Sequence, residues 1–201
     1  MKLTAVPKDS KLHAYCMQCR QEFAYTKSQV SYRCPNCNHI DTRALIIDPA
    51  VNWWLDRSGE YWHETGGIFV RNSEGQFLFF DRTKHPFGLT VPAGHVDRGE
   101  RPSRTARREL SEETGIRLPQ RAFTHVVTSN IAGDECRRGA DAHRWHVYAA
   151  RIPTSVTVKV DASEGARPVW LDLNQALRQN LTFAVRHLIT RYGPQIERTP
   201  G

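Results

Sequence analysis

The sequence predicts an α/β sandwich, a mixed β-sheet covered by helices, preceded by a small cysteine-rich segment. Residues 1–48 hold four of the five cysteines, whereas apolar, strand-like and helix-like runs alternate after residue 63. A length of 201 residues is enough for one ordinary domain and a small appendage. We therefore divide the chain into an N-terminal segment at 1–48, a linker at 49–62 and a main domain at 63–201.

The elements of the main domain follow from local patterns. Two strands at 67–71 and 76–81 flank the turn-rich residues 72–75, which predicts a hairpin. A helix is expected at 102–114, because Pro102 suits a first helical turn and Gly115 suits the position after the last one. Further strands are expected at 89–91, 123–131, 143–152, 156–160 and 168–171, and a helix at 173–192 with a break near Asn180.

Composition and charge limit the class of protein. Charged residues make up 24% and hydrophobic ones 39%, which is typical of a globular chain. The sequence shows neither an apolar signal segment nor a run of about 20 apolar residues, so we expect a soluble cytoplasmic protein with no membrane partner. The net charge of +7 favours anionic partners such as nucleotides, nucleic acid or pyrophosphates, although solubility alone explains it equally well.

The N-terminal cysteines form two C-x₂-C pairs: Cys16 with Cys19, and Cys34 with Cys37. This spacing is typical of a four-thiolate zinc site, and a segment this small needs a metal to supplement its core. A closed site of four thiolates has no open position, so we expect a structural zinc ribbon, with a role in contacting substrate, nucleic acid or a second subunit left open. We expect Cys136 to be a free loop thiol without function.

The predicted helix at 102–114 carries a cluster of acids. Glu109, Glu112 and Glu113 are spaced i, i+3 and i+4, so the three carboxylates share one helical face. Their mutual repulsion is relieved by a divalent cation, and oxygen donors suit Mg²⁺ or Mn²⁺. Arg108 can orient Glu109 by a charge-assisted hydrogen bond. For Glu112 and Glu113 alone, a solvated helix face paired with arginines explains the pattern as well.

The whole stretch from Gly94 to Ile116 matches G-x₅-E-x₇-R-E-U-x-E-E-x-G-U at every position, where U is aliphatic. This resembles the Nudix box. The resemblance implies a Nudix α/β/α sandwich, one to three Mg²⁺ or Mn²⁺ ions, and attack by an activated water on a nucleoside diphosphate linked to another group. It also implies metal ligands at Glu109, Glu112, Glu113 and the carbonyl of Ala93.

The same resemblance implies a catalytic set of Glu109, Glu112 and Arg108, with Glu100 and Arg108 supporting the loop. The general base is one of the box glutamates or a later carboxylate. Some family members recruit one more glutamate before the last strand, which here is Glu164. Asp134, Glu135 and Asp141 are its rivals.

Residues that bind the substrate are harder to predict from the sequence. Arg82 is a candidate to hold phosphates, and Phe80 and Trp145 are candidates to stack on a base. Packing in the core is the alternative for each aromatic residue.

A zinc ribbon before a Nudix domain resembles the layout of the NADH pyrophosphatases, but their S-Q-P-W-P-F-P-x-S signature after the box is absent; residues 127–134 read VTSNIAGD. We therefore expect hydrolysis of a pyrophosphate bond in a small nucleotide-type substrate. The alternatives are NAD-cap or RNA 5′-end processing, and a catalytically silent nucleotide sensor. The resemblance also implies a homodimer as one assembly.

Overall fold

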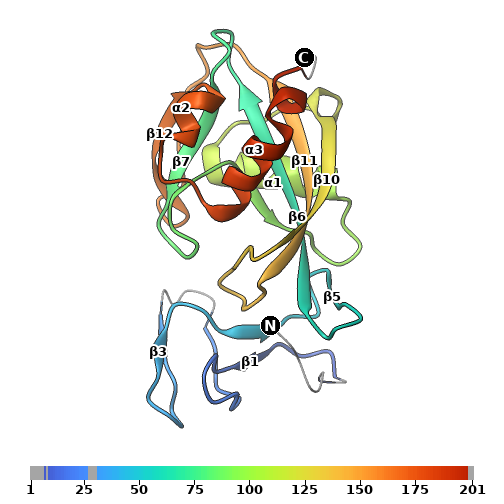
Figure 1. The fold of residues 1–201 in the computed structure, drawn as a ribbon, viewed down its shortest axis with the longest axis vertical. Coiled ribbons are helices and arrows are strands. Elements are labelled where there is room, and N and C mark those ends of the chain that lie inside the picture. Colours follow the sequence, from blue (N-terminus) through green and yellow to red (C-terminus); the bar gives the residue numbers. More distant parts are fainter. Residues whose placement is uncertain (1–6, 8, 27–30, 199–201) are drawn as a thin grey trace.

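The computed structural model describes residues 7, 9–26 and 31–198, in which one large sheet and two small sheets are present (Figure 1). The large sheet contains eight strands: β5 (Trp53–Leu55), β6 (Tyr61–Arg71), β7 (Phe77–Arg82), β8 (Leu89–Thr90), β9 (Ala93–His95), β10 (Thr124–Ala132), β11 (Ala142–Arg151) and β12 (Gly165–Leu171). Its path runs β10-β11-β6-β7-β12, while β5 and β9 pair with β6 and β8 pairs with β7. Only β11 and β6 pair in parallel, so the sheet is mixed, as predicted.

Helices cover both faces of this sheet (Figure 1). They are α1 (Pro102–Thr114), the 3₁₀ turn η1 (Gln120–Ala122), α2 (Leu173–Leu177) and α3 (Phe183–Arg198). Side chains of β6 alternate between the two faces. Ile68 and Val70 pack with Leu110 of α1, whereas Phe69 packs with Leu188 of α3. The α/β/α sandwich is therefore confirmed.

The boundaries of α1 agree with the predicted ones. Proline begins the helix, and Gly115 ends it in the left-handed conformation, with φ of 72°. The break in the C-terminal helical region is also present, because α2 ends at Leu177 and α3 begins at Phe183.

The expected strand at 156–160 is wrong. The backbone amide of Lys159 donates to the carbonyl of Thr114 at 3.0 Å, and that of Asp161 donates to the carbonyl of Glu113 at 2.9 Å. These carbonyls lie at the C-terminal end of α1, where the helix offers them no partner. The segment therefore satisfies the end of α1 instead of extending the sheet.

Two short antiparallel pairs make up the N-terminal segment, which lies below the main domain in Figure 1. Strand β1 (His13–Tyr15) pairs with β4 (Leu45–Ile47), and β2 (Tyr32–Arg33) pairs with β3 (Ile40–Asp41). The rings of Phe23 and Tyr32 stack 4.5 Å apart against the cysteines in a small core. These two aromatic residues therefore pack internally.

Backbone hydrogen bonds connect the N-terminal segment to the main domain. The amides of Ala44 and Ile46 donate to the carbonyls of Arg137 and Arg138 at 3.0 and 3.1 Å. Residues 49–62, which we expected to form a linker, contain β5 and the first residues of β6. None of the helices in the described part of the chain combines the length and apolarity needed to cross a bilayer.

Candidate active site

The loop between β9 and α1 brings Glu109 onto the backbone of Gly94. Gly94 pairs with Gly66 of β6 and so has a fixed position at the sheet. A Cβ atom added to Gly94 would lie 2.0 Å from Oε1 of Glu109, far inside van der Waals contact. The first residue of the box must therefore be glycine for this carboxylate to lie where it does.

Arg108 lies among the carboxylates of the box. One Nη donates to Glu109 at 2.6 Å and to Glu112 at 3.2 Å, and the other donates to Glu100 at 3.3 Å. Glu100 also accepts a hydrogen bond from the hydroxyl of Thr105 at 2.7 Å. The guanidinium thus joins the loop to the helix and orients Glu109.

Two box glutamates are removed from water. Glu113 is buried, and its carboxylate accepts a hydrogen bond from the amide of Ala93 at 2.9 Å. Burial raises the pKa of Glu109 to about 7, against the opposing charge of Arg108. Burial and the nearby charge of Glu109 raise the pKa of Glu113 well above its usual range. The protein alone therefore leaves negative charge poorly compensated here.

This donor set fits Mg²⁺ or Mn²⁺, which bind carboxylate and carbonyl oxygens. Two clusters in the described ranges have ligand atoms of all members within 4.8 Å of one another, and neither contains a box glutamate. Glu112 is 60% exposed and turned toward Arg108. Its side chain must rotate for the carboxylates to share one cation.

A cavity of about 620 Å³ lies beside these carboxylates. The glutamates of α1 form part of its wall, and Arg82 and Lys84 supply positive charge to the same space. Leu12 and Tyr25 of the N-terminal segment also line it. The volume is in the range of small-molecule sites.

Among the four loop acids considered, the structure favours Glu164. It lines the cavity, accepts a hydrogen bond from Nζ of Lys84 at 2.9 Å, and its charge contributes to the raised pKa values of Glu109 and Glu113.

Two of the three rivals, Asp134 and Glu135, also line the cavity, but the carboxylates of all three have partners away from the box glutamates. Glu135 and Asp141 both pair with Arg43. Asp134 is buried, and its carboxylate accepts a hydrogen bond from the indole of Trp145 at 2.7 Å.

The three residues predicted to bind substrate lie in different environments. Arg82 lines the cavity. Trp145 also lines it, but it is only 7% exposed and belongs to the core between the sheet and α3. Phe80 is fully buried, with its ring against Gly165, so it has no free face to stack on a base. For Phe80 the core alternative is correct.

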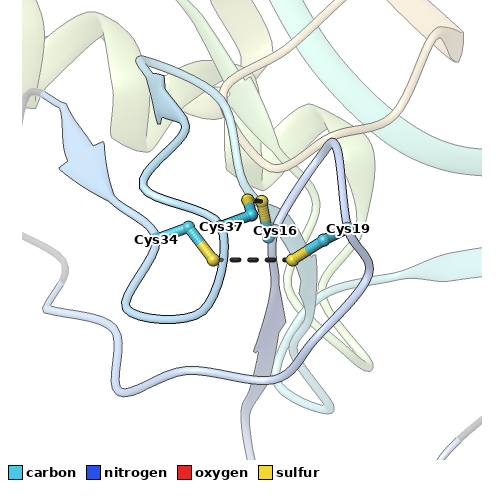
Figure 2. Close-up of side chains that lie close together, drawn as sticks. All are labelled: Cys16, Cys19, Cys34 and Cys37. Atoms are coloured by element: carbon cyan, nitrogen blue, oxygen red, sulfur yellow. Dashed lines mark hydrogen bonds between the residues drawn. The ribbon is translucent and has the colours of Figure 1, made fainter.

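The four N-terminal cysteines converge as predicted (Figure 2). The sulfurs of Cys16 and Cys37 are 3.7 Å apart, and those of Cys19 and Cys34 are 3.5 Å apart. Zinc–sulfur bonds of about 2.3 Å in a tetrahedron place sulfurs about 3.8 Å apart. The arrangement can therefore hold a zinc ion.

Cys136 is a free thiol in the loop between β10 and β11, as expected, but it is not isolated. It is buried, and together with His63, His95 and His143 it forms the second cluster of potential metal ligands in the described residues. No sequence pattern reveals this cluster, because its members come from four separate segments without a ligand-like spacing.

Comparisons with known proteins agree with this geometry. The family model described as NUDIX domain matches residues 62–192. A curated relative, the "Uncharacterized Nudix hydrolase orf19" of Rhodococcus erythropolis, is 42% identical over 65 residues, which are 29% of this chain and only 35% of that protein.

Solved structures share the fold at low identity. The MutT protein from Methanosarcina mazei Go1 matches with a TM-score of 0.56 and 21% identity, over 67% of this chain and 94% of that one. The NUDIX domain of Shewanella oneidensis NrtR, solved with ADP ribose, matches with a TM-score of 0.56 and 20% identity, over 71% and 93%. The complete box, the sandwich and the family match lead to one conclusion: this chain belongs to the Nudix hydrolase family.

Proposed function

We propose that this chain is a Mg²⁺- or Mn²⁺-dependent pyrophosphohydrolase that cleaves a phosphoanhydride in a nucleoside-diphosphate-linked small molecule. One observation carries the proposal: the box glutamates line the same cavity as Arg82 and Lys84. Acidic groups that can hold a divalent cation therefore line the same small cavity as cationic groups that can hold phosphates.

Glu109, Glu112, Glu113 and the carbonyl of Ala93 would hold the cation. When bound, a divalent cation neutralises pyrophosphate oxygens and lowers the pKa of a coordinated water. Arg108 positions Glu109, to which it donates at 2.6 Å.

Proton transfer needs a carboxylate within reach of the attacking water. Glu112 is exposed at the cavity wall, and Glu164 faces the same space from the loop before β12. Either can accept a proton from a water beside the scissile phosphate. Lys84 holds Glu164 at 2.9 Å and keeps it at the cavity.

The walls of the cavity favour a small substrate over a long RNA. Leu12 and Tyr25 of the N-terminal segment line part of the cavity, and residues of the main domain line most of the rest. The NrtR domain was solved with ADP ribose, and another protein of the same fold is an Ap4A hydrolase from C. elegans, at a TM-score of 0.53, 20% identity, 66% coverage of this chain and 96% of that one. We therefore propose a nucleotide with a second group beyond its phosphates.

The cysteines also bear on location. All five are free thiols, as zinc thiolates require, and such sites persist in reducing compartments. We propose a cytoplasmic enzyme on this ground. The homodimer implied by the family resemblance remains a proposal that sedimentation of the full chain tests.

The test is product release from a substrate panel in Mg²⁺ and in Mn²⁺. The panel contains ADP-ribose, NADH, diadenosine polyphosphates, nucleotide sugars, canonical and oxidised triphosphates, and NAD-capped RNA. Glu112→Gln removes an exposed carboxylate and so spares the fold, and Glu74→Gln in the exposed β6–β7 turn is its matched control.

We expect the chain to turn over one class of small molecule. Glu112→Gln should abolish this turnover, and Glu74→Gln should leave it unchanged. Preference for capped RNA would replace the small-molecule proposal with RNA end processing. Binding of a nucleotide without any turnover would refute catalysis and favour a sensing role.

A further inference from the structure

Four side chains other than the box carboxylates meet beside the cavity, and three of them, His95, Cys136 and His143, line it. His63 belongs to β6, His95 to β9, His143 to β11, and Cys136 to the loop between β10 and β11. Each offers one ligand atom, and these atoms all lie within 4.8 Å of one another. His63, Cys136 and His143 are buried, with exposures of 1%, 8% and 3%.

Hydrogen bonds fix the tautomer of His63. The hydroxyl of Tyr61 lies 2.8 Å from the carbonyl of Ile46 and 2.8 Å from Nε2 of His63. Because its single proton goes to the carbonyl, the hydroxyl must accept from Nε2–H. The other nitrogen, Nδ1, is therefore unprotonated in the neutral ring, and it faces the cluster.

The same reasoning fixes His143. Its Nδ1 lies 2.9 Å from the carbonyl of Asp134 and 3.1 Å from the carboxylate of the same residue. Both of these oxygens only accept hydrogen bonds, so Nδ1 carries a proton, and in the neutral ring the lone pair of Nε2 is available to a metal. A histidine whose outer nitrogen donates to a carbonyl, carboxylate or hydroxyl is oriented for metal binding through its inner one.

Two of the distances between ligand atoms are close to those around a tetrahedral ion, and the others are no longer than 4.8 Å. Nδ1 of His63 is 3.1 Å from Nε2 of His95 and 3.5 Å from the sulfur of Cys136. Bonds of about 2.0–2.1 Å to nitrogen and 2.3 Å to sulfur place tetrahedral ligands about 3.3–3.6 Å apart. Small adjustments of these side chains suffice to enclose one ion.

We propose that His63, His95, Cys136 and His143 bind a second zinc ion, separate from the four-cysteine site and from the carboxylate site. Three imidazoles and a thiolate in a tetrahedron suit zinc by ligand type and geometry. With four protein ligands the site has no open position, so its role is structural.

The position of this ion defines what it stabilises. His95 directly follows Gly94, the residue that Glu109 contacts, so the ion ties the start of the box loop to β6 and β11. The loop that carries Cys136 also accepts backbone hydrogen bonds from residues 44 and 46 of the N-terminal segment. One ion therefore joins the box loop, the sheet and the junction with the zinc ribbon.

The first test is the zinc content of the purified full chain after dialysis against metal-free buffer. The proposal expects two zinc ions per chain. Cys136→Ala should lower the content to one ion, whereas His125→Ala, which removes an exposed histidine of β10, should keep two. One ion in the unsubstituted chain, or two in Cys136→Ala, overturns the proposal.

A spectroscopic measurement covers the case in which Cys136→Ala does not fold. X-ray absorption at the zinc edge of the unsubstituted chain reports the ligands directly. A mixed shell of sulfur and imidazole nitrogen supports the site. A pure sulfur shell means that only the four-cysteine site is filled and that the histidines form a metal-free hydrogen-bond network, which overturns the proposal.

Discussion

Replacing Gly94 with alanine tests whether the position of Glu109 controls catalysis. The added Cβ would lie 2.0 Å from Oε1 and 2.2 Å from Cδ of Glu109, whereas real Cβ contacts are essentially never under 3.0 Å. The carboxylate must therefore move by about 1 Å, and a displacement of that size in an active site costs on the order of 100-fold in rate. This corresponds to about 2.7 kcal/mol in activation free energy.

The fold should tolerate the change, because φ of Gly94 lies outside the left-handed region. Alanine also reduces the entropy of the unfolded chain, which stabilises by about 0.4–1 kcal/mol and offsets part of the local strain. We expect a Tm within about 4 °C of the unsubstituted chain. Gly193→Ala is the matched control, since its Cβ would meet Leu173 at an ordinary 3.5 Å.

The assay is kcat/KM at saturating Mg²⁺ on the substrate that the panel identifies, together with the double variant Gly94→Ala/Glu109→Gln. If the alanine acts through Glu109, the double variant loses little more activity than Glu109→Gln alone. Activity within threefold of the unsubstituted chain, or losses that add fully in the double variant, would refute the reasoning.

Three further perturbations have expected outcomes. Arg108→Ala should lower kcat/KM by about 10- to 100-fold, because the box carboxylates lose the donor that they share. Arg107 is exposed, so Arg107→Ala should leave kcat/KM unchanged, and equal losses in the two variants would contradict the role of Arg108. Trp145→Phe leaves the buried carboxylate of Asp134 without its 2.7 Å donor and should cost about 1–3 kcal/mol in urea unfolding, and an unchanged midpoint would count against it. Cys34→Ser should release the zinc of the four-cysteine site and lower the Tm, which metal analysis and calorimetry measure. An unchanged zinc content and Tm would mean that this cluster binds no metal.

The sequence predicted the parts of the fold that local chemistry determines. Pro102 and Gly115 fixed the ends of α1, since each residue suits a helix boundary for reasons confined to its own backbone. The two C-x₂-C pairs likewise predicted a cluster whose members are near one another in the chain. The strand at 156–160 failed because its amides bond to the end of α1, a tertiary contact that β-propensity does not contain.

Burial explains the remaining errors in the site. Phe80 on β7 and Trp145 on β11 belong to one sheet, with β6 between them, and only the packing around the sheet decides how far each ring is exposed. Arg82 and Glu164 could be proposed because a charged residue beside a strand end usually reaches solvent or a cavity. Aromatic residues at such positions carry no comparable signal.

The histidine cluster shows why strand register limits what a sequence can reveal about a site. His63 and His143 are Cα partners in the parallel pair of β6 and β11, although about eighty residues separate them in the chain. A register shifted by one residue would turn the His143 side chain to the opposite face of the sheet and remove it from the cluster. No single segment specifies the register of strands joined by so long a connection. The register is specified when the apolar residues of both strands pack against α1 on one face of the sheet and α3 on the other. The second metal site therefore depends on the core as much as on its four ligands, and it becomes visible only when the sheet is assembled.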